Sequence, residues 1–166
     1  MDLQQIQEKY KEVIPVPIVT IAKELGIDVY ETDEFKDDLS GSIKKEGENF
    51  AIYVNVNQSP WRKRFTIAHE IGHFLKHREK IDPEHTDTVK QPSPELHRED
   101  GVILSAEERK MEQEANEIAA DILMPKDAFV REFEKATDIA EVAKKFGVSA
   151  SAATVRALKL TNSFTN

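Results

Sequence analysis

The stretch FTIAHEIGHFLKH, residues 65–77, constrains the fold of this chain more than any other. An α-helix advances by about 100° per residue, so His69 and His73, which are four residues apart, face the same side one turn apart. The opposite side of the same helix is apolar and holds Ile67, Ala68, Ile71, Phe74 and Leu75. The pattern therefore predicts an amphipathic helix that buries one face and presents two imidazoles on the other.

Two imidazoles in this arrangement can bind one divalent ion, because Zn–N bonds are only about 2.0–2.1 Å long. Glu70 lies to one flank of the polar stripe, where it can hydrogen-bond a water on the metal but is badly placed as a ligand. This is the H-E-x-x-H arrangement. It predicts metal ligands at His69 and His73 and a catalytic base at Glu70, against the alternative of ordinary packed histidines. His77 shares the stripe two turns on, and we expect it to be a surface residue rather than a ligand or a substrate contact.

A catalytic zinc needs three protein ligands and one open position. In the metzincin class the third ligand would be a histidine at position 79, with a glycine at position 76. Those positions hold Glu79 and Lys76, so this class is excluded. The third ligand must come from elsewhere, and a carboxylate on a second helix is the natural candidate.

The helix predicted over residues 106–124 offers such a carboxylate. In its helical phase Glu112 and Asn116 stand one turn apart at the margin of the apolar face, whereas Glu114 falls on the solvent side. We therefore predict Glu112 as the third ligand and Glu114 as a charged surface residue. Asn116 is expected to hold the other ring nitrogen of a ligand histidine, with a capping or surface amide as the alternative.

Composition and charge limit the remaining choices. With 166 residues the chain is expected to be one domain, and the absence of cysteine means that any metal is held by nitrogen and oxygen. The net charge of −8 argues against a general nucleic-acid binder. No apolar run approaches the roughly 18 residues of a membrane span. Residues 1–5 have neither the basic start nor the apolar stretch of a secretory signal, so we expect a cytoplasmic protein without a membrane partner.

The pattern of apolar residues predicts an α+β fold. The expected strands are 27–31, 40–46 and 49–57, and the expected helices are 3–13, 17–25, 62–76, 106–124, a short one after Asp127, and a helix–turn–helix over 138–160. Residues 78–105 are expected to be irregular, as a lid, a binding segment or a surface loop. We expect residues 1–135 to form the main domain and residues 136–166 to pack on the same core.

The helical tail has a composition that a DNA-binding helix–turn–helix favours. Ala143, Gly147 and Ser149 occur in the order of that motif, with Ser149 as the N-cap of the second helix. Only two basic residues, Arg156 and Lys159, lie on that second helix. Direct DNA binding is therefore not expected, and a helix pair that packs on the core or touches a partner is favoured.

Two motifs together, RFTIAHEIGHFLKH and EQEANEIAADILMP, resemble those of the ImmA/IrrE family of bacterial and phage metallopeptidases. PVPIVTIAKELGIDVY and FAIYVNVNQSPWRKRF agree with it upstream, so the resemblance spans most of residues 14–130. Ile118 departs conservatively from the usual phenylalanine. The chain is also too short for the sensor-like domain of longer members.

The resemblance implies a zincin-like fold, with a small antiparallel or mixed three-stranded sheet packed on the HExxH helix and on a second ligand-bearing helix. It also implies a zinc-dependent endopeptidase of the gluzincin type, with His69, His73 and Glu112 as ligands and Glu70 as base. The usual substrate in this family is a helix-turn-helix repressor, whose cleavage relieves repression in mobile-element induction or stress response.

Several alternatives stay open at this point. Two histidines and a glutamate also accept Mn²⁺ or Fe²⁺. The protein could instead be a non-proteolytic regulator, or a toxin–antitoxin component, that acts by binding its repressor. His85, His97 and Tyr53 are candidates to stabilise an oxyanion, although each is expected to be structural. A substrate segment is expected to add as a strand to an edge of the sheet that contains residues 50–56.

Overall fold

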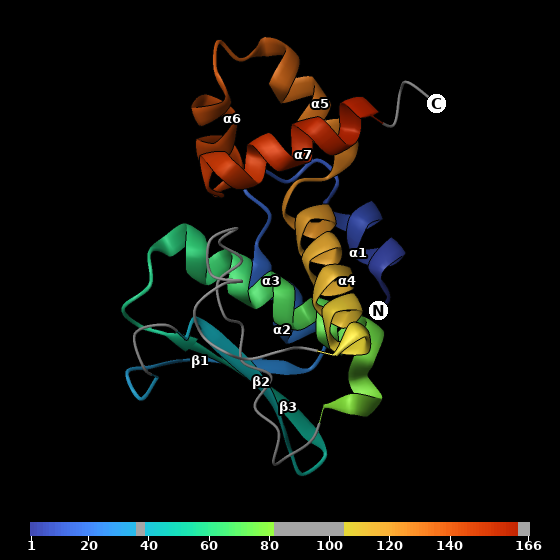
Figure 1. Cartoon of the computed structure of the whole chain (residues 1–166), viewed down its shortest axis with the longest axis vertical. Helices are drawn as coiled ribbons and strands as arrows, with labels where there is room; N and C mark the ends of the chain where they lie inside the picture. Colours follow the sequence, from blue (N-terminus) through green and yellow to red (C-terminus); the bar gives the residue numbers. More distant parts are fainter. Residues whose placement is uncertain (36–38, 82–104, 163–166) are drawn as a thin grey trace.

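The computed structural model describes residues 1–35, 39–81 and 105–162. Within these ranges the elements follow one another in a mixed order, drawn in Figure 1: α1 (Leu3–Tyr10), α2 (Ile18–Glu24), β1 (Ile27–Thr32), β2 (Gly41–Glu46), β3 (Asn49–Asn55), α3 (Pro60–His77), the 3₁₀ turn η1 (Arg78–Lys80), α4 (Ala106–Leu123), α5 (Lys126–Lys135), α6 (Ile139–Phe146) and α7 (Ala150–Asn162). The predicted α+β class is confirmed. Most of the segment 78–105, including His85 and His97, lies outside the described residues.

The sheet of the described chain is small and mixed, in the strand order β1-β3-β2. β3 pairs in parallel with β1, with Val29 opposite Ile52, and antiparallel with β2, with Ile43 also opposite Ile52. The central strand is thus β3, so residues 50–56 offer no edge themselves. The edges that remain for an added strand, among the described strands, belong to β1 and β2.

One face of β3 packs against α3, which explains its alternating apolar residues. Phe50, Ile52 and Val54 are at most 4% exposed, and the ring of Phe50 meets the ring of Phe74 edge-on at 5.0 Å between centroids. Aromatic pairs of this kind add to the stabilisation that burial provides. The sheet therefore fixes the depth and direction of the helix that carries His69 and His73.

Local signals set where the two longest helices begin. α3 starts at Pro60, a residue that fits the first turn because it has no N–H to leave unsatisfied. α4 starts with a capping box, in which the Ser105 side chain accepts from the Glu108 N–H and the Glu108 side chain accepts from the Ser105 N–H. Pro125 then separates α4 from α5. These signals set where each helix begins and where α4 ends.

The C-terminal helices share the core of the rest. In Figure 1 α5, α6 and α7 gather at one end, above α3 and α4. Val142, Phe146 and Leu160 belong to the same cluster of buried apolar side chains as Ile52 and Ile71. Because one cluster spans both segments, their packing energies are coupled. Among the described residues, no helix is both long and apolar enough to cross a membrane.

A single arginine links three distant parts of the backbone. The Arg64 guanidinium on α3 donates to the carbonyl oxygen of Val16 at 2.9 Å, of Gly147 at 3.2 Å and of Phe146 at 3.4 Å. Gly147 closes α6 with a positive φ of 64°, a conformation that glycine adopts without strain. Arg64 therefore holds the end of α6 against the N-terminal half of α3.

Candidate metal centre

The site lies where α3 crosses α4, and one glycine allows the close approach. A Cβ added at Gly72 would lie 2.8 Å from the carbonyl oxygen of Ala115 and 3.0 Å from its Cα. These distances are below normal van der Waals contact, so any larger residue at position 72 would push the helices apart. The backbone contact between Gly72 and Ala115 thus brings the polar stripe of α3 within reach of the side chains of α4.

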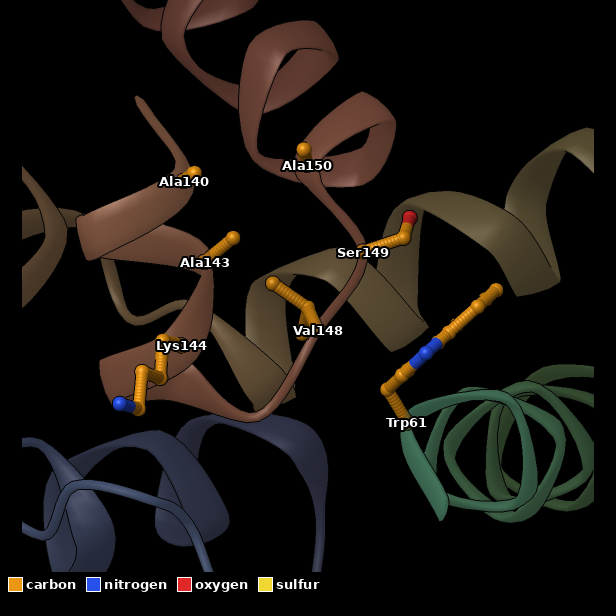
Figure 2. A pocket seen from close by; sticks show the side chains of 7 residues that line it. All are labelled: Trp61, Ala140, Ala143, Lys144, Val148, Ser149 and Ala150. Carbon is orange, nitrogen blue, oxygen red and sulfur yellow. The ribbon is translucent and has the colours of Figure 1, made fainter. Parts of the chain in front are cut away.

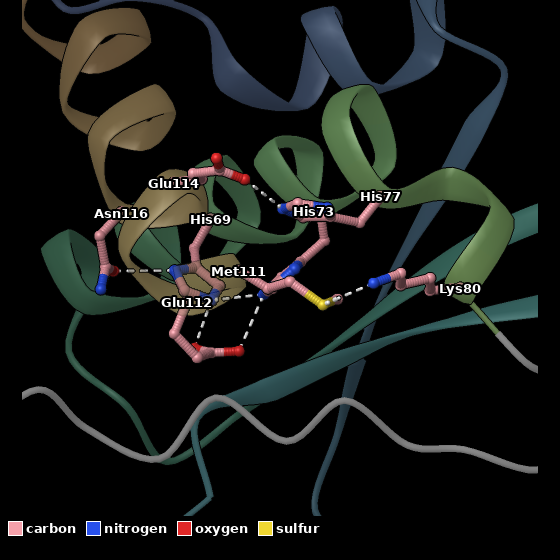
Figure 3. A network of polar contacts seen from close by, with 8 residues as sticks. All are labelled: His69, His73, His77, Lys80, Met111, Glu112, Glu114 and Asn116. Carbon is pink, nitrogen blue, oxygen red and sulfur yellow. Dashed lines mark hydrogen bonds and ion pairs between the residues drawn. The ribbon is translucent and has the colours of Figure 1, made fainter. Parts of the chain in front are cut away.

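The three predicted ligands converge at this crossing (Figure 3). Nε2 of His69 and Nε2 of His73 are 2.9 Å apart, and the Glu112 carboxylate lies 3.2 Å from the first and 3.1 Å from the second. One ligand atom from each residue lies within 4.8 Å of the others. Both imidazoles are 1% exposed, whereas the Glu112 side chain is 36% exposed. The cluster is therefore buried on its histidine side and accessible through Glu112.

The donor set fits a divalent transition-metal ion. Two Zn–N bonds of about 2.05 Å at a tetrahedral angle separate the nitrogens by about 3.3 Å, so the observed 2.9 Å requires only a small outward movement. Asn116 Oδ1 lies 2.9 Å from His69 Nδ1. Because an amide oxygen only accepts, Nδ1 carries a proton, and Nε2 is the ring nitrogen that faces Glu112 and that a cation would bind. Asn116 thus lies beside His69, one of the two histidines predicted as ligands.

Opposing effects set the ionisation of Glu112. Burial by itself would raise the pKa of this carboxyl, but hydrogen bonds from His69 and His73, together with their charge, bring the pKa well below its ordinary value. The group is therefore a carboxylate at neutral pH. A carboxylate beside two imidazole nitrogens is the ionisation state that a cation requires of its ligands.

Glu70 occupies the same turn of α3 as the two histidines and is fully buried. Its side chain has contacts within the fold. It follows His69 directly on α3 and is not one of the three converging donors. This is the flank position that the helical phase predicts.

The structure differs from the sequence expectation at Glu114 and His77. Glu114 is only 27% exposed in its side chain, and its Oε2 lies 3.1 Å from Nε2 of His77, whose side chain is 10% exposed. Burial lowers the pKa of His77, and Glu114 partly offsets that effect. Helical phase placed Glu114 on the solvent side of its own helix, and it could not show that Glu114 meets His77 where α4 lies along α3.

Tyr53, a candidate for oxyanion stabilisation, is engaged elsewhere. Its hydroxyl donates to Glu46 Oε1 at 2.6 Å, and this hydrogen bond, with burial, raises its pKa to about 12. Its ring lies 5.5 Å from the ring of Tyr30 on β1. The structure thus gives Tyr53 a role in the sheet. Sequence reasoning missed Gly72 as a site residue, although a glycine inside an otherwise strong helix is a signal of close approach.

A family comparison decides the class of this chain: the model of the IrrE N-terminal-like domain, a peptidase family, matches residues 22–158. The chain belongs to this family. The resemblance to ImmA/IrrE peptidases is thereby confirmed over most of the chain, including α6 and α7. No curated protein sequence matches the chain.

A solved structure shares the fold. A transcriptional regulator from Mycobacterium tuberculosis matches with a TM-score of 0.59 and 20% sequence identity, over 93% of this chain and 45% of that chain. The present chain therefore spans less than half the length of that regulator. At 20% identity this similarity shows a shared fold and nothing about a shared activity.

Proposed function

We propose that this member of the IrrE N-terminal-like family is a zinc-dependent endopeptidase, with His69, His73 and Glu112 as metal ligands and Glu70 as the catalytic base. The observation that carries the proposal is the convergence of two buried imidazoles and one carboxylate from two separate helices. Membership in a peptidase family gives this donor set its chemical context. Mn²⁺ or Fe²⁺ suits the same ligands, so the choice of zinc is part of the proposal.

When bound, a zinc ion supplies Lewis acidity, which lowers the pKa of a coordinated water toward about 7 and polarises a peptide carbonyl. Glu70 then accepts the proton of the attacking water on a carboxylate oxygen and delivers it to the departing amide nitrogen. Asn116 fixes the tautomer of His69 through Nδ1. The burial of His69, Glu70 and His73 keeps bulk water from their inner side, which strengthens the electrostatic interactions there.

We further propose that the substrate is a helix-turn-helix transcriptional repressor in the cytoplasm, so that cleavage relieves repression in a mobile element or a stress response. The resemblance to ImmA/IrrE peptidases supports this substrate class. The structural neighbour that is described as a transcriptional regulator is consistent with a regulatory setting, although it shares only the fold. Direct contact of this chain with DNA is not part of the proposal, because the net charge is −8.

The test is Glu70→Gln, assayed against a helix-turn-helix repressor encoded beside this gene. The variant should keep its zinc, measured by elemental analysis, and should lose about 10²–10⁴-fold in cleavage rate, because it removes the proton acceptor and leaves the ligands. Glu79→Gln, the same change at an exposed carboxylate after α3, is the matched control and should keep full activity.

Two results would contradict the proposal. Full activity of Glu70→Gln would remove Glu70 from the mechanism. A zinc-loaded wild-type protein that binds the repressor and releases its DNA without producing fragments on a gel would favour the alternative, a non-proteolytic regulator or toxin–antitoxin component.

A further inference from the structure

An open hollow lies apart from the metal centre, between the start of α3 and the turn that joins α6 to α7. Its volume is about 390 Å³, near the lower end of the roughly 300–1,000 Å³ of ligand pockets. Apolar groups form most of its lining, chiefly Trp61, Ala143 and Val148, with small Ala140 and Ala150 at the sides. Figure 2 shows the indole of Trp61, from α3, across the hollow from α6. The hollow is therefore an apolar recess that small side chains leave open.

Trp61 makes this recess an unusual surface feature. It is the only tryptophan of the chain, and it is 43% exposed although tryptophan is mostly buried in folded proteins. Exposed aromatic residues that border an apolar recess are typical of protein interfaces, where they supply large contact area at low entropic cost. Trp61 precedes His69 by about 12 Å along the axis of α3, so a chain bound at the metal centre could also reach the hollow.

Two cations flank the hollow without an acidic partner. Cζ of Arg62 lies 5.8 Å from the centre of the Trp61 ring, and Lys144 is one of the lining residues. In the part of the chain that the structure describes, neither forms an ion pair with a carboxylate. By contrast, the neighbouring Lys63 and Lys145 are paired, at 2.9 and 2.8 Å from acidic side chains. The charges of Arg62 and Lys144 are thus available to an external anion.

Partial burial strengthens the attraction of Arg62 for an approaching anion. Desolvation lowers the pKa of its guanidinium, which means that water stabilises the charge less than it would at an open surface. A carboxylate that approached would gain more from this cation than from one in free solution. The combination of an apolar recess and cations beside it is complementary to a segment with the opposite charge and an apolar side chain.

We propose that the hollow is a docking site for an acidic, amphipathic helical segment of a protein partner, which places an apolar side chain between Trp61 and Ala143 and its carboxylates near Arg62 and Lys144. The inference extends the proposed function, because it rests on a protein substrate and gives that substrate a second point of contact. Nucleic acid is disfavoured as the occupant, since two available cations in a chain of net charge −8 are few for a phosphate backbone.

The test uses Trp61 as its own reporter, because the single tryptophan makes the intrinsic fluorescence specific to this site. Two short helical peptides are titrated into the zinc-loaded Glu70→Gln protein; both have leucines on one face, and one has glutamates and the other lysines on the opposite face. The glutamate peptide should shift the emission in a saturable way, with an affinity that falls as salt rises. The lysine peptide should bind at least about tenfold more weakly.

Matched charge reversals then locate the contact. Lys144→Glu and Arg62→Glu should each weaken the glutamate peptide by about tenfold, as expected for the loss of a favourable charge and the gain of a repulsive one. Lys45→Glu makes the same change at an exposed lysine on β2 that forms no ion pair with any described residue; β2 lies far from α6 and α7 in Figure 1, and the change should leave the affinity within about twofold.

Three outcomes would overturn the docking site: no binding of the glutamate peptide, equal binding of both peptides, or equal weakening by Lys45→Glu. Tighter binding of single-stranded DNA, with quenching of Trp61, would reassign the hollow to nucleic acid. The fluorescence titration needs no cleavage, so the two tests are independent. Failure of the glutamate peptide to bind would not affect the cleavage test with Glu70→Gln, and failure of the cleavage test would not affect the fluorescence result.

Discussion

Two helix pairs of this molecule, α3 with α4 and α6 with α7, use small residues for opposite purposes. At the first crossing Gly72 contacts the backbone of Ala115, and the helices close over His69, His73 and Glu112. At the second pair, small residues such as Ala140 leave a hollow of about 390 Å³ beside Trp61. Small side chains let two helices approach closely where the facing residue is also small, as Ala115 is opposite Gly72. Where no residue packs against them, as at Ala140, they leave a hollow that a partner can fill.

The difference is also one of polarity. The α3–α4 crossing buries imidazoles and a carboxylate that bond one another, and burying such groups is costly unless each finds a partner or a metal. The α6–α7 pair buries apolar groups such as Phe146 and leaves Val155 and Leu158 on α7 53% and 58% exposed. Changes at the first pair should therefore affect chemistry and stability together, whereas changes at exposed residues of the second, such as Val155 and Leu158, should spare both.

The largest effect is expected from Gly72→Leu, which would force α3 and α4 apart. Because the added side chain meets the backbone of Ala115, the free energy of unfolding should fall by about 3 kcal/mol, and the ligands should no longer converge. Thermal unfolding and zinc titration measure the two losses. Ala140→Leu, which adds three carbon atoms at the open hollow where Gly72→Leu adds four at the crossing, should change stability by no more than about 0.5 kcal/mol and keep the zinc. Unchanged zinc affinity in Gly72→Leu would refute the role given to this crossing.

Next in size is the removal of a proposed ligand. Glu112→Ala should weaken zinc binding by more than about 100-fold, beyond the range of supporting residues, because it takes away one of three ligands. Glu114→Ala removes a carboxylate two residues away that contacts His77 instead, and it should keep the metal. Competition with a chromogenic chelator gives both affinities. Loss of metal in Glu114→Ala but not in Glu112→Ala would exchange the two assignments.

A smaller loss is expected when the support of His69 is removed. Asn116→Ala deletes the acceptor of the His69 Nδ1 proton, and zinc affinity should fall by about 10–100-fold while all three ligands remain. Gln113→Ala on the exposed face of α4 is the matched control and should bind zinc as the wild type does. An Asn116→Ala protein with wild-type affinity would show that the ring of His69 is held by packing alone.

The smallest effect concerns pH in the metal-free protein. The pKa of Glu112 lies below its unfolded value near 4.5, so the stabilisation from its ionised form is fully present above that pH and is lost as the pH falls toward the folded value. The free energy of unfolding, measured with urea at a series of pH values from 6 downward, should show this decline. Glu112→Gln should make the free energy of unfolding depend less steeply on pH. An identical slope in the variant would mean that other carboxyl groups control acid unfolding.

Sequence reasoning reached the elements whose signals are local. The helix predicted at 62–76 is observed as Pro60–His77 and that at 106–124 as Ala106–Leu123, because periodicity, proline and the cap at Ser105 act within a few residues. The first helix ends at Tyr10 rather than at 13. Helical phase also selected His69, His73, Glu112 and Asn116, which the structure brings together at the crossing of α3 and α4.

What sequence reasoning could not reach depends on pairings between distant segments. The central place of β3 requires knowledge of both its neighbours, one parallel and one antiparallel. The contact of Glu114 with His77 depends on how far α4 runs along α3, and the hollow at Trp61 depends on where the α6–α7 turn docks. None of these contacts produces a periodic pattern of residues in the sequence.

The hydrogen bonds of Arg64 limit where the chain can be truncated without loss of stability. Two of the carbonyl groups that accept its hydrogen bonds, those of Phe146 and Gly147, lie beyond residue 135, in the C-terminal helical segment. Expression of residues 1–135 alone would strip this half-buried guanidinium of those acceptors and uncover the apolar side of α3 next to it. We therefore expect residues 1–135 to be unstable on their own, and a stable fragment must retain at least the end of α6.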